Sequence, residues 1–163
     1  MLGERITDTC GAEGNGSMNG LGFLPVCTVF GREKKRTQTT GTVRITEGIL
    51  KPLSGTKVQG YEIHMGQTEM TGQTACRHFL DLEGGPDGAS FNHVFGTYLH
   101  GIFDSDEFRT KLVRLLCERK GISYGGKTAV SYRDYKEGQY DKLAEQLRES
   151  LDMNAICEIL EED

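Results

Sequence analysis

Hydrophobic residues in the first half of the chain recur at every second position, which predicts β-strands. The first expected strand is the apolar segment Val26–Phe30, and the glycine-rich stretch Cys10–Gly20 before it is expected to be a loop. Between residues 42 and 70 hydrophobic and polar residues alternate, and the hydrophobic ones include Val43, Ile45, Tyr61, Ile63 and Met65. A period of two residues is typical of half-buried strands, and we expect these strands to pair antiparallel.

The apolar run Val94–Leu99 predicts a further strand, buried in the middle of a sheet. It ends at His100, and Gly101 follows. Ligands and catalytic groups of open α/β sheets gather at the carboxyl ends of strands. A histidine at a strand end also serves purely structural roles, but the adjacent glycine lets another group approach the ring and favours a function.

The last third of the chain predicts three helices. Asp104 and Glu107 have the spacing of a capping box, and Gly121 is the expected end of the first helix. A second apolar stripe runs over residues 140–151, and a third over residues 153–160 with Asp152 as its cap. The predicted order is therefore a β-rich part, then one buried strand, then helices.

Composition and charge narrow the classes of function. The 163 residues suit one domain, and the net charge of −5 argues against a broad nucleic-acid surface. No apolar run approaches the ~20 residues that span a bilayer, so no membrane segment is expected. The five cysteines are scattered without a C-x-x-C pair, which is typical of reduced thiols in a cytoplasmic protein.

Two pattern matches do not predict sites. Residues 121–128 fit the phosphate-loop pattern G-x-x-x-x-G-K-[ST], but a helix is expected before them where that motif needs a strand, and residues 129–132 do not read as a helix start. Cys76 and His78 lack the paired short spacings of a metal site, so no metal is expected.

Two other features stay open. Glu62 and His64 form either an ordinary polar strand face or a carboxylate and imidazole beside a pocket, and residues 32–36 form a basic run typical of a solvated strand edge.

Three blocks of sequence resemble a known family. They are GLGFLP at Gly20–Pro25, GYEIHMG at Gly60–Gly66 and GTYLHGIFD at Gly96–Asp104. In this order they resemble the C-terminal glutamine amidotransferase domains of cobyric acid synthases, which are of the class I (triad) type. The resemblance runs over nearly the whole chain and implies an α/β fold that is the C-terminal part of a flavodoxin-like domain. Such a part has a mixed sheet with an antiparallel extension and C-terminal helices.

The resemblance implies a chemistry and a set of site residues. In such domains a cysteine thiolate attacks the side-chain amide of glutamine and a histidine carries protons. By match of motif, His100 is the catalytic histidine. Ile102 stands where the wider class has a glutamate, so Glu62 or Asp104 is left to orient the ring, and the sequence does not choose between them. Arg36 is the candidate for the α-carboxylate of glutamine, because a guanidinium pairs with a carboxylate through two hydrogen bonds.

The resemblance also bears on domain organisation and partners. The family's nucleophile elbow, G-x-C-G-G-x-Q-x-L-G, would place its cysteine shortly before Met1, so residues 1–163 are expected to form a partial amidotransferase domain that lacks this elbow and the synthase domain. Glutamine is the implied substrate. The implied partner is an N-terminal synthase domain or subunit, where ATP and magnesium act on a corrinoid, and this chain itself is expected to hold no cofactor. The alternative is a non-catalytic fragment, or a subunit that needs a separately encoded N-terminal half.

Overall fold

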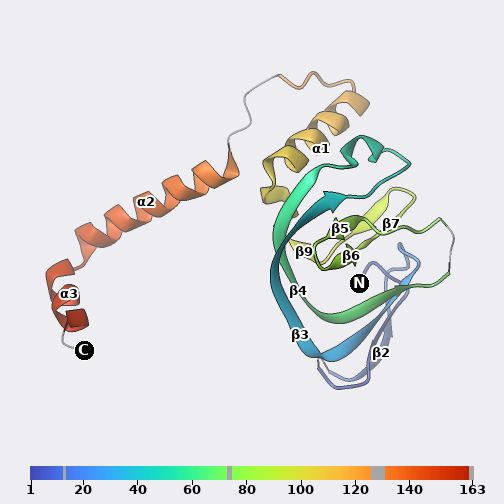
Figure 1. Ribbon diagram of the computed structural model, residues 1–163, viewed down its shortest axis with the longest axis horizontal. Helices are drawn as coiled ribbons and strands as arrows, with labels where there is room; N and C mark the ends of the chain where they lie inside the picture. The colour runs from blue at the N-terminus through green and yellow to red at the C-terminus, as the bar shows by residue number, and fades with distance from the viewer. Residues whose placement is uncertain (13, 73–74, 126–130, 162–163) are drawn as a thin grey trace. The chain divides into compact units, whose positions relative to one another are not determined.

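The computed structural model describes residues 1–12, 14–72, 75–125 and 131–161, which form two compact units, Met1–Gly126 and Lys127–Asp163. The first unit contains most of the secondary structure (Figure 1). Its elements in chain order are β1 (Arg5–Asp8), β2 (Gly16–Asn19), β3 (Val26–Val43), the 3-10 helix η1 (Lys51–Leu53), β4 (Lys57–Met70), β5 (Leu80–Leu82), β6 (Gly85–Asp87), β7 (Ala89–Phe91), β8 (Val94–Gly96), β9 (Leu99–His100), the 3-10 helix η2 (Ile102–Asp104) and α1 (Asp106–Arg119).

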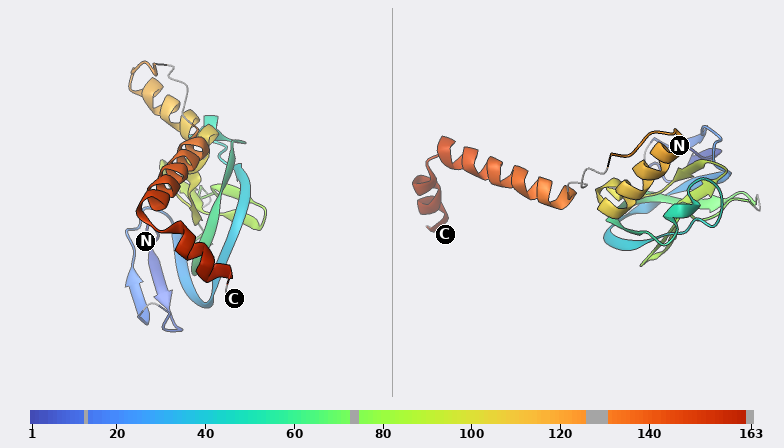
Figure 2. Two further views of the ribbon diagram at one scale, coloured as in Figure 1. Left: turned by 90° about the vertical axis from the view of Figure 1, so that its left-hand side faces the viewer. Right: turned by 90° about the horizontal axis from the view of Figure 1, so that it is seen from above.

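A mixed sheet organises the first unit. Its order is β2-β1-β3-β4-β9, with β5 paired to β3 and β6 to β5. Strands β1 and β3 are parallel, and the other pairs are antiparallel. Strands β7 and β8 form a small antiparallel hairpin of their own. The β1–β2 hairpin extends from one end of the sheet (Figure 2, left).

Strands β3 and β4 form a long, curved antiparallel pair that dominates the sheet (Figure 1). The pairing is interrupted by an irregularity after Phe30: Phe30 lies opposite Gly66, but the next aligned residue, Lys35, lies opposite His64. Five steps on β3 therefore match two on β4. Because side chains alternate between faces, this odd number of extra residues reverses which β3 positions face the core.

The main core lies between one face of this sheet and α1. The buried residues of the cluster are Val43, Ile45, Leu50, Leu53, Val58, Phe79, Leu80, Leu82, Leu99, Ile102 and Phe108. A smaller cluster of buried residues comprises Leu24, Val26, Cys76 and Ala89. Helix α1 packs against η1, η2 and β4, and Phe108 anchors it in the main cluster. This packing fixes the segment that carries His100.

The second unit contains two helices, α2 (Tyr132–Ser150) and α3 (Met153–Glu161). Ser131 caps α2, because its side chain accepts a hydrogen bond from the backbone N–H of Asp134. Asp152 caps α3 by accepting the N–H groups of Asn154 and Ala155 at 3.1 Å each. The prediction of two C-terminal helices, with Asp152 as the cap of the last, is confirmed, although α2 begins earlier than its apolar stripe.

Several local predictions are wrong. The run Val94–Leu99 is not one central strand: β8 ends at Gly96 in the small hairpin, and β9 starts at Leu99 in the large sheet. The stretch Cys10–Gly20 contains strand β2, which pairs with β1. Helix α1 starts at Asp106 without a capping box, because the Ser105 hydroxyl that could cap it accepts the backbone N–H of Gln59 at 3.0 Å.

The broader fold prediction is confirmed: the sheet is mixed, its extension is antiparallel and the C-terminal elements are helices. The predicted end of α1 is also confirmed, since Gly121 follows it with a φ of 64°. A helix thus precedes the residues that match the phosphate-loop pattern, as predicted. Residues 126–128 of that pattern, and residues 129 and 130 after it, lie outside the described residues. The expectation that no helix starts near Tyr132 is wrong.

Candidate functional site

His100 is held by backbone carbonyl groups at the end of β9. Its Nδ1 lies 2.9 Å from the carbonyl oxygen of Tyr98 and 3.2 Å from that of Tyr61. A carbonyl oxygen only accepts hydrogen bonds, so Nδ1 carries the proton and donates. Nε2 has no hydrogen-bond partner among the described residues, and the side chain is exposed. The neutral ring therefore presents its lone pair at Nε2, as a general base requires.

Gly60 allows β9 to lie this close to β4. A Cβ atom at position 60 would collide with the carbonyl oxygen of His100 and would lie 3.2 Å from Leu99 Cδ1. A side chain here would push β9 away from β4. Gly101, directly after His100, has a φ of 80°, a conformation that L residues rarely adopt. Both glycines serve the placement of His100.

Arg36 lies on the same face of the sheet as His100. Tyr61 is directly opposite His100, Gln38 is opposite Tyr61, and Arg36 lies two residues before Gln38. Opposite residues of antiparallel strands share a face, and residues two apart on one strand do too. The backbones of Arg36 and His100 are separated by about 10 Å across the strands and about 7 Å along them.

Glu62 lies on the opposite face, because its partner on β9 is the buried Leu99. Its carboxylate binds Lys35 Nζ at 2.7 Å and His64 Nε2 at 2.8 Å, as the shared face predicted for Glu62 and His64 requires. Burial raises the pKa of Glu62, but the hydrogen bonds and positive charges of Lys35 and His64 lower it by more, so the pKa lies below its usual value.

Both ring nitrogens of His64 are engaged in hydrogen bonds. Its Nδ1 lies 2.7 Å from the carbonyl oxygen of Gly66, and its Nε2 faces the Glu62 carboxylate. Both partners are acceptors, so neither ring nitrogen is left facing open space. A ring with both nitrogens engaged in this way is not placed to take a proton from a substrate, which separates His64 from the role of His100.

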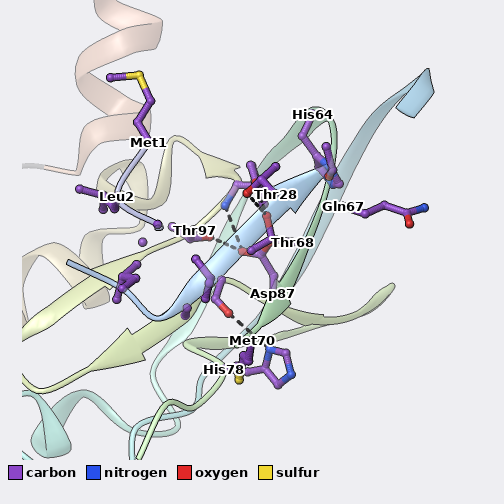
Figure 3. A pocket seen from close by; sticks show the side chains of 18 of the residues that line it. Met1, Leu2, Thr28, His64, Gln67, Thr68, Met70, His78, Asp87 and Thr97 are labelled. Atoms are coloured by element: carbon purple, nitrogen blue, oxygen red, sulfur yellow. Dashed lines mark hydrogen bonds between the residues drawn. The ribbon is translucent and has the colours of Figure 1, made fainter. Parts of the chain in front are cut away.

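A cavity of about 460 Å³ adjoins the sheet face that carries Glu62 and His64. Its lining residues are Met1, Leu2, Gly3, Leu24, Val26, Thr28, Glu62, His64, Gly66, Gln67, Thr68, Met70, His78, Asp87, Gly88, Ala89, Gly96, Thr97 and Tyr98. Figure 3 shows Thr28, Thr68, Asp87 and Thr97 gathered on one side and Met1 and Leu2 across from them. His100 and Arg36 are not among the lining residues.

Asp104 ends η2, just beyond His100. Its backbone N–H donates to the carbonyl oxygen of Gly101 at 2.8 Å, and its carboxylate lies beside Gly101. The described contacts join neither Asp104 nor Glu62 directly to His100. The orienting role of either acid and the substrate-binding role of Arg36 stay predictions.

None of the five cysteines lines the cavity. Burial raises the pKa of the Cys76 thiol, which keeps it protonated and poorly nucleophilic. Cys10 donates weakly to the Asp8 carboxylate at 3.4 Å. Within the described part of the chain, no group of three His, Cys, Asp or Glu side chains is arranged to hold a metal ion. No helix among these residues is long and apolar enough to cross a membrane.

Sequence reasoning missed three residues that shape this region: Lys35, Tyr98 and Asp87. Tyr98 stacks on His64 with ring centroids 4.5 Å apart and 24° between the planes. Asp87 is buried and accepts the Tyr98 backbone N–H at 3.2 Å. Lys35 was interpreted as part of a solvated basic run, and only the β3 irregularity puts it opposite His64. Asp87 stands in the glycine- and proline-rich stretch of residues 83–88, where an aspartate is typical of a turn, so no local signal indicated its buried position.

Comparison with known proteins identifies the family. Residues 1–108 match the CobB/CobQ-like glutamine amidotransferase domain. The chain is 42% identical to a cobyric acid synthase of Lachnoclostridium phytofermentans over 99% of its own length and 34% of the relative's. It is 41% identical to a cobyric acid synthase of Ruminiclostridium cellulolyticum, with 99% and 33% covered, and 38% identical to a probable cobyric acid synthase of Methanosarcina barkeri, with 98% and 31% covered.

The chain thus spans about a third of the length of the curated relatives it matches. The resemblance seen in the three sequence blocks is confirmed, since the family match over residues 1–108 contains all three blocks, the last of which ends at Asp104. The chain belongs to the CobB/CobQ-like glutamine amidotransferase domain family.

Proposed function

We propose that this chain contributes the glutamine-hydrolysing part of a cobyric acid synthase, with His100 as its proton carrier. The observation that carries the proposal is the hydrogen bonding of His100: Nδ1 donates to two carbonyl groups, and Nε2 is exposed with its lone pair available. The similarity to cobyric acid synthases over 99% of the chain supports the choice of reaction.

In the proposed reaction, Nε2 of His100 takes the proton of a cysteine thiol, and the sulfur attacks the side-chain amide carbon of glutamine. The tetrahedral intermediate collapses when the C–N bond breaks, and the imidazolium gives its proton to the departing ammonia. Water then hydrolyses the glutamyl thioester to glutamate and restores the thiol. None of the five cysteines of this chain is assigned as the nucleophile. Arg36 is proposed to bind the α-carboxylate of glutamine, on the sheet face that it shares with His100.

The released ammonia is proposed to serve a synthase domain or subunit, where ATP and magnesium activate corrinoid carboxylates for amidation in cobalamin biosynthesis. Corrinoid recognition belongs to that partner, and this chain is proposed to need no cofactor of its own. The cytoplasm is the proposed compartment, because glutamine and ATP are both available there.

A chimera tests the proposal. This chain replaces the matching third of the Lachnoclostridium phytofermentans relative. The remaining part of that relative is expected to supply the elbow with its cysteine and the synthase domain. His100→Ala should lower glutamine-dependent amidation by about 10²–10⁴-fold. Amidation with added ammonia should continue, because it bypasses glutamine hydrolysis. His93→Ala is the matched control: His93 is also exposed, but it lies in the turn between β7 and β8.

The outcomes separate the proposal from its alternative. Glutamine-dependent activity that survives His100→Ala within a few-fold contradicts the role of His100. A chimera that uses ammonia but never glutamine, although it is folded, favours a non-catalytic fragment or a subunit that requires a different N-terminal half.

A further inference from the structure

We infer that Tyr98 is a positioning residue for His100: Asp87, Thr68 and the Glu62–His64 pair hold Tyr98 so that its carbonyl group fixes the His100 tautomer. This inference rests on the proposed function for its catalytic meaning. Its structural content, the tautomer of one ring, can be measured without any turnover.

The contact between the two residues is a single hydrogen bond with a chemical consequence. The Tyr98 carbonyl oxygen lies 2.9 Å from His100 Nδ1, the shorter of the two bonds this nitrogen makes. As long as the carbonyl stays there, the proton of the neutral ring stays on Nδ1 and the lone pair stays on Nε2. A shift of Tyr98 would leave Nδ1 only the longer hydrogen bond to Tyr61, so the proton would exchange more readily between the two nitrogens.

Tyr98 lies where the sheet itself does not fix it. Thr97 and Tyr98 form the crossing between β8, which belongs to the small hairpin, and β9, which belongs to the large sheet. Side chains hold this crossing instead. Asp87 accepts the Tyr98 backbone N–H at 3.2 Å and also the Thr97 hydroxyl, whose oxygen in turn accepts the Leu99 N–H at 2.9 Å.

The ring of Tyr98 is held at its edge and on its face. Its hydroxyl is 2.5 Å from Thr68 Oγ1, and Thr68 Oγ1 is 2.7 Å from Thr28 Oγ1. On its face it stacks against His64 at 4.5 Å. Anchors on the backbone, the hydroxyl and the ring face together leave Tyr98 little freedom to move.

This arrangement gives Glu62 an indirect role. The carboxylate binds His64 at 2.8 Å, His64 stacks on Tyr98, and the Tyr98 carbonyl oxygen accepts a hydrogen bond from His100 Nδ1. Glu62 therefore acts on His100 from the opposite face of the sheet, through two intervening residues. It is a positioning residue in this scheme, whereas His100 is the group that meets the reacting atoms.

The first test is ¹⁵N NMR of the full chain with labelled histidine, at a pH where the His100 ring is neutral. In the unmodified chain, Nδ1 should resonate as a protonated nitrogen and Nε2 as an unprotonated one. In Tyr98→Ala the two resonances should move toward each other as the tautomers mix. Tyr98→Phe keeps the stacked ring and the backbone and removes only the hydroxyl's hydrogen bond to Thr68, so it should move the resonances less than Tyr98→Ala does.

A second variant keeps the test decisive if Tyr98→Ala does not fold. His64→Asn removes the stacked ring from the other side and leaves Tyr98 intact, so it should shift the His100 resonances in the same direction. Tyr135→Ala is the control, because Tyr135 is 56% exposed on α2 in the second unit. A folded Tyr98→Ala or His64→Asn variant with the unmodified His100 pattern overturns the inference.

Kinetics in the chimera give the functional readout. Tyr98→Ala should lower kcat for glutamine by about 10-fold or more, because a small misplacement of a reacting group is costly. The KM for glutamine should change little, since Tyr98 lies behind the histidine. An unchanged kcat, or a loss expressed only in KM, contradicts the positioning role. A chimera without glutamine turnover refutes the proposed function and leaves the NMR result standing.

Discussion

Tyr61 and His100 lie directly opposite each other on β4 and β9, and the carbonyl oxygen of Tyr61 is 3.2 Å from His100 Nδ1. The pair fixes which face of the sheet presents the histidine. Tyr61 is 53% exposed on that face, and Arg36 lies on it as well. Glu62, one residue on, faces the other way. The sheet thus separates His100, the proposed proton carrier, from Glu62, one of the two acids predicted to orient it.

Arg36→Ala should raise the KM for glutamine in the chimera by about 10-fold or more, because a charged hydrogen bond to the substrate carboxylate would be lost. Amidation driven by ammonia should keep its rate. Steady-state kinetics with both nitrogen donors measure the two effects. Arg32→Ala, in the irregular part of the same strand, is the control and should leave the KM unchanged. An equal change of KM in both variants would mean that Arg36 is only part of a solvated basic strand edge.

Gly60→Ala should destabilise the first unit and displace His100. The added Cβ meets the His100 carbonyl oxygen, and relieving such a clash costs about 1–3 kcal/mol. A lower Tm and a changed His100 NMR pattern should appear together. Gly138→Ala is the counterpart, because Gly138 lies in α2 with open space around it, and alanine favours a helix by about 1 kcal/mol. A Gly60→Ala chain with an unchanged Tm would show that β9 tolerates the displacement.

Glu62→Gln should lower the free energy of unfolding by about 1–3 kcal/mol at neutral pH, since it removes the carboxylate that binds Lys35 and His64. The pKa of Glu62 is lowered in the folded chain, so its stabilisation is complete above the unfolded value, near 4.5, and is lost as the pH falls through the folded pKa. Urea unfolding at several pH values measures this.

The difference between Glu62→Gln and the unmodified chain should therefore be constant near neutrality and shrink in acid below about pH 4.5. Glu69→Gln provides the comparison, because Glu69 is an exposed carboxylate on the same strand. A Glu62 effect that does not exceed the Glu69 effect would mean that the ion pairs contribute nothing measurable.

The 163-residue chain by itself should not hydrolyse glutamine, because none of its five cysteines matches the family's nucleophile. Release of glutamate from glutamine by the purified chain is the measurement. Activity that is present and disappears in Cys10→Ala would contradict this expectation and assign the thiol role to Cys10.

Local patterns predicted the elements whose surroundings are uniform along their length. The alternation over residues 42–70 predicted β4 and the shared face of Glu62 and His64, and the helical stripes predicted α1 and α3. Each of these elements follows a single hydrophobic periodicity along its length and buries one face.

The failures have a common physical reason. Val94–Leu99 changes from one sheet to another within six residues, because buried Asp87 binds Thr97 and Tyr98, and no local pattern records a partner so distant in sequence. The role inferred for Tyr98 was equally invisible, since it depends on a stacking partner on β4. His100 was found by motif, whereas its tautomer required the positions of two carbonyl groups.

The irregularity in β3 also constrains how this family can change in length. Between Phe30 and Lys35 an odd number of extra residues places Lys35 beside Glu62 and leaves Arg36 on the His100 face. Insertion or deletion of a single residue there would exchange the two faces. Lys35 would then lie on the His100 face, and Arg36 would lie on the face of the buried Glu62. Natural insertions and deletions at this point should therefore contain an even number of residues, because only these keep Lys35 and Arg36 on their present faces of the sheet.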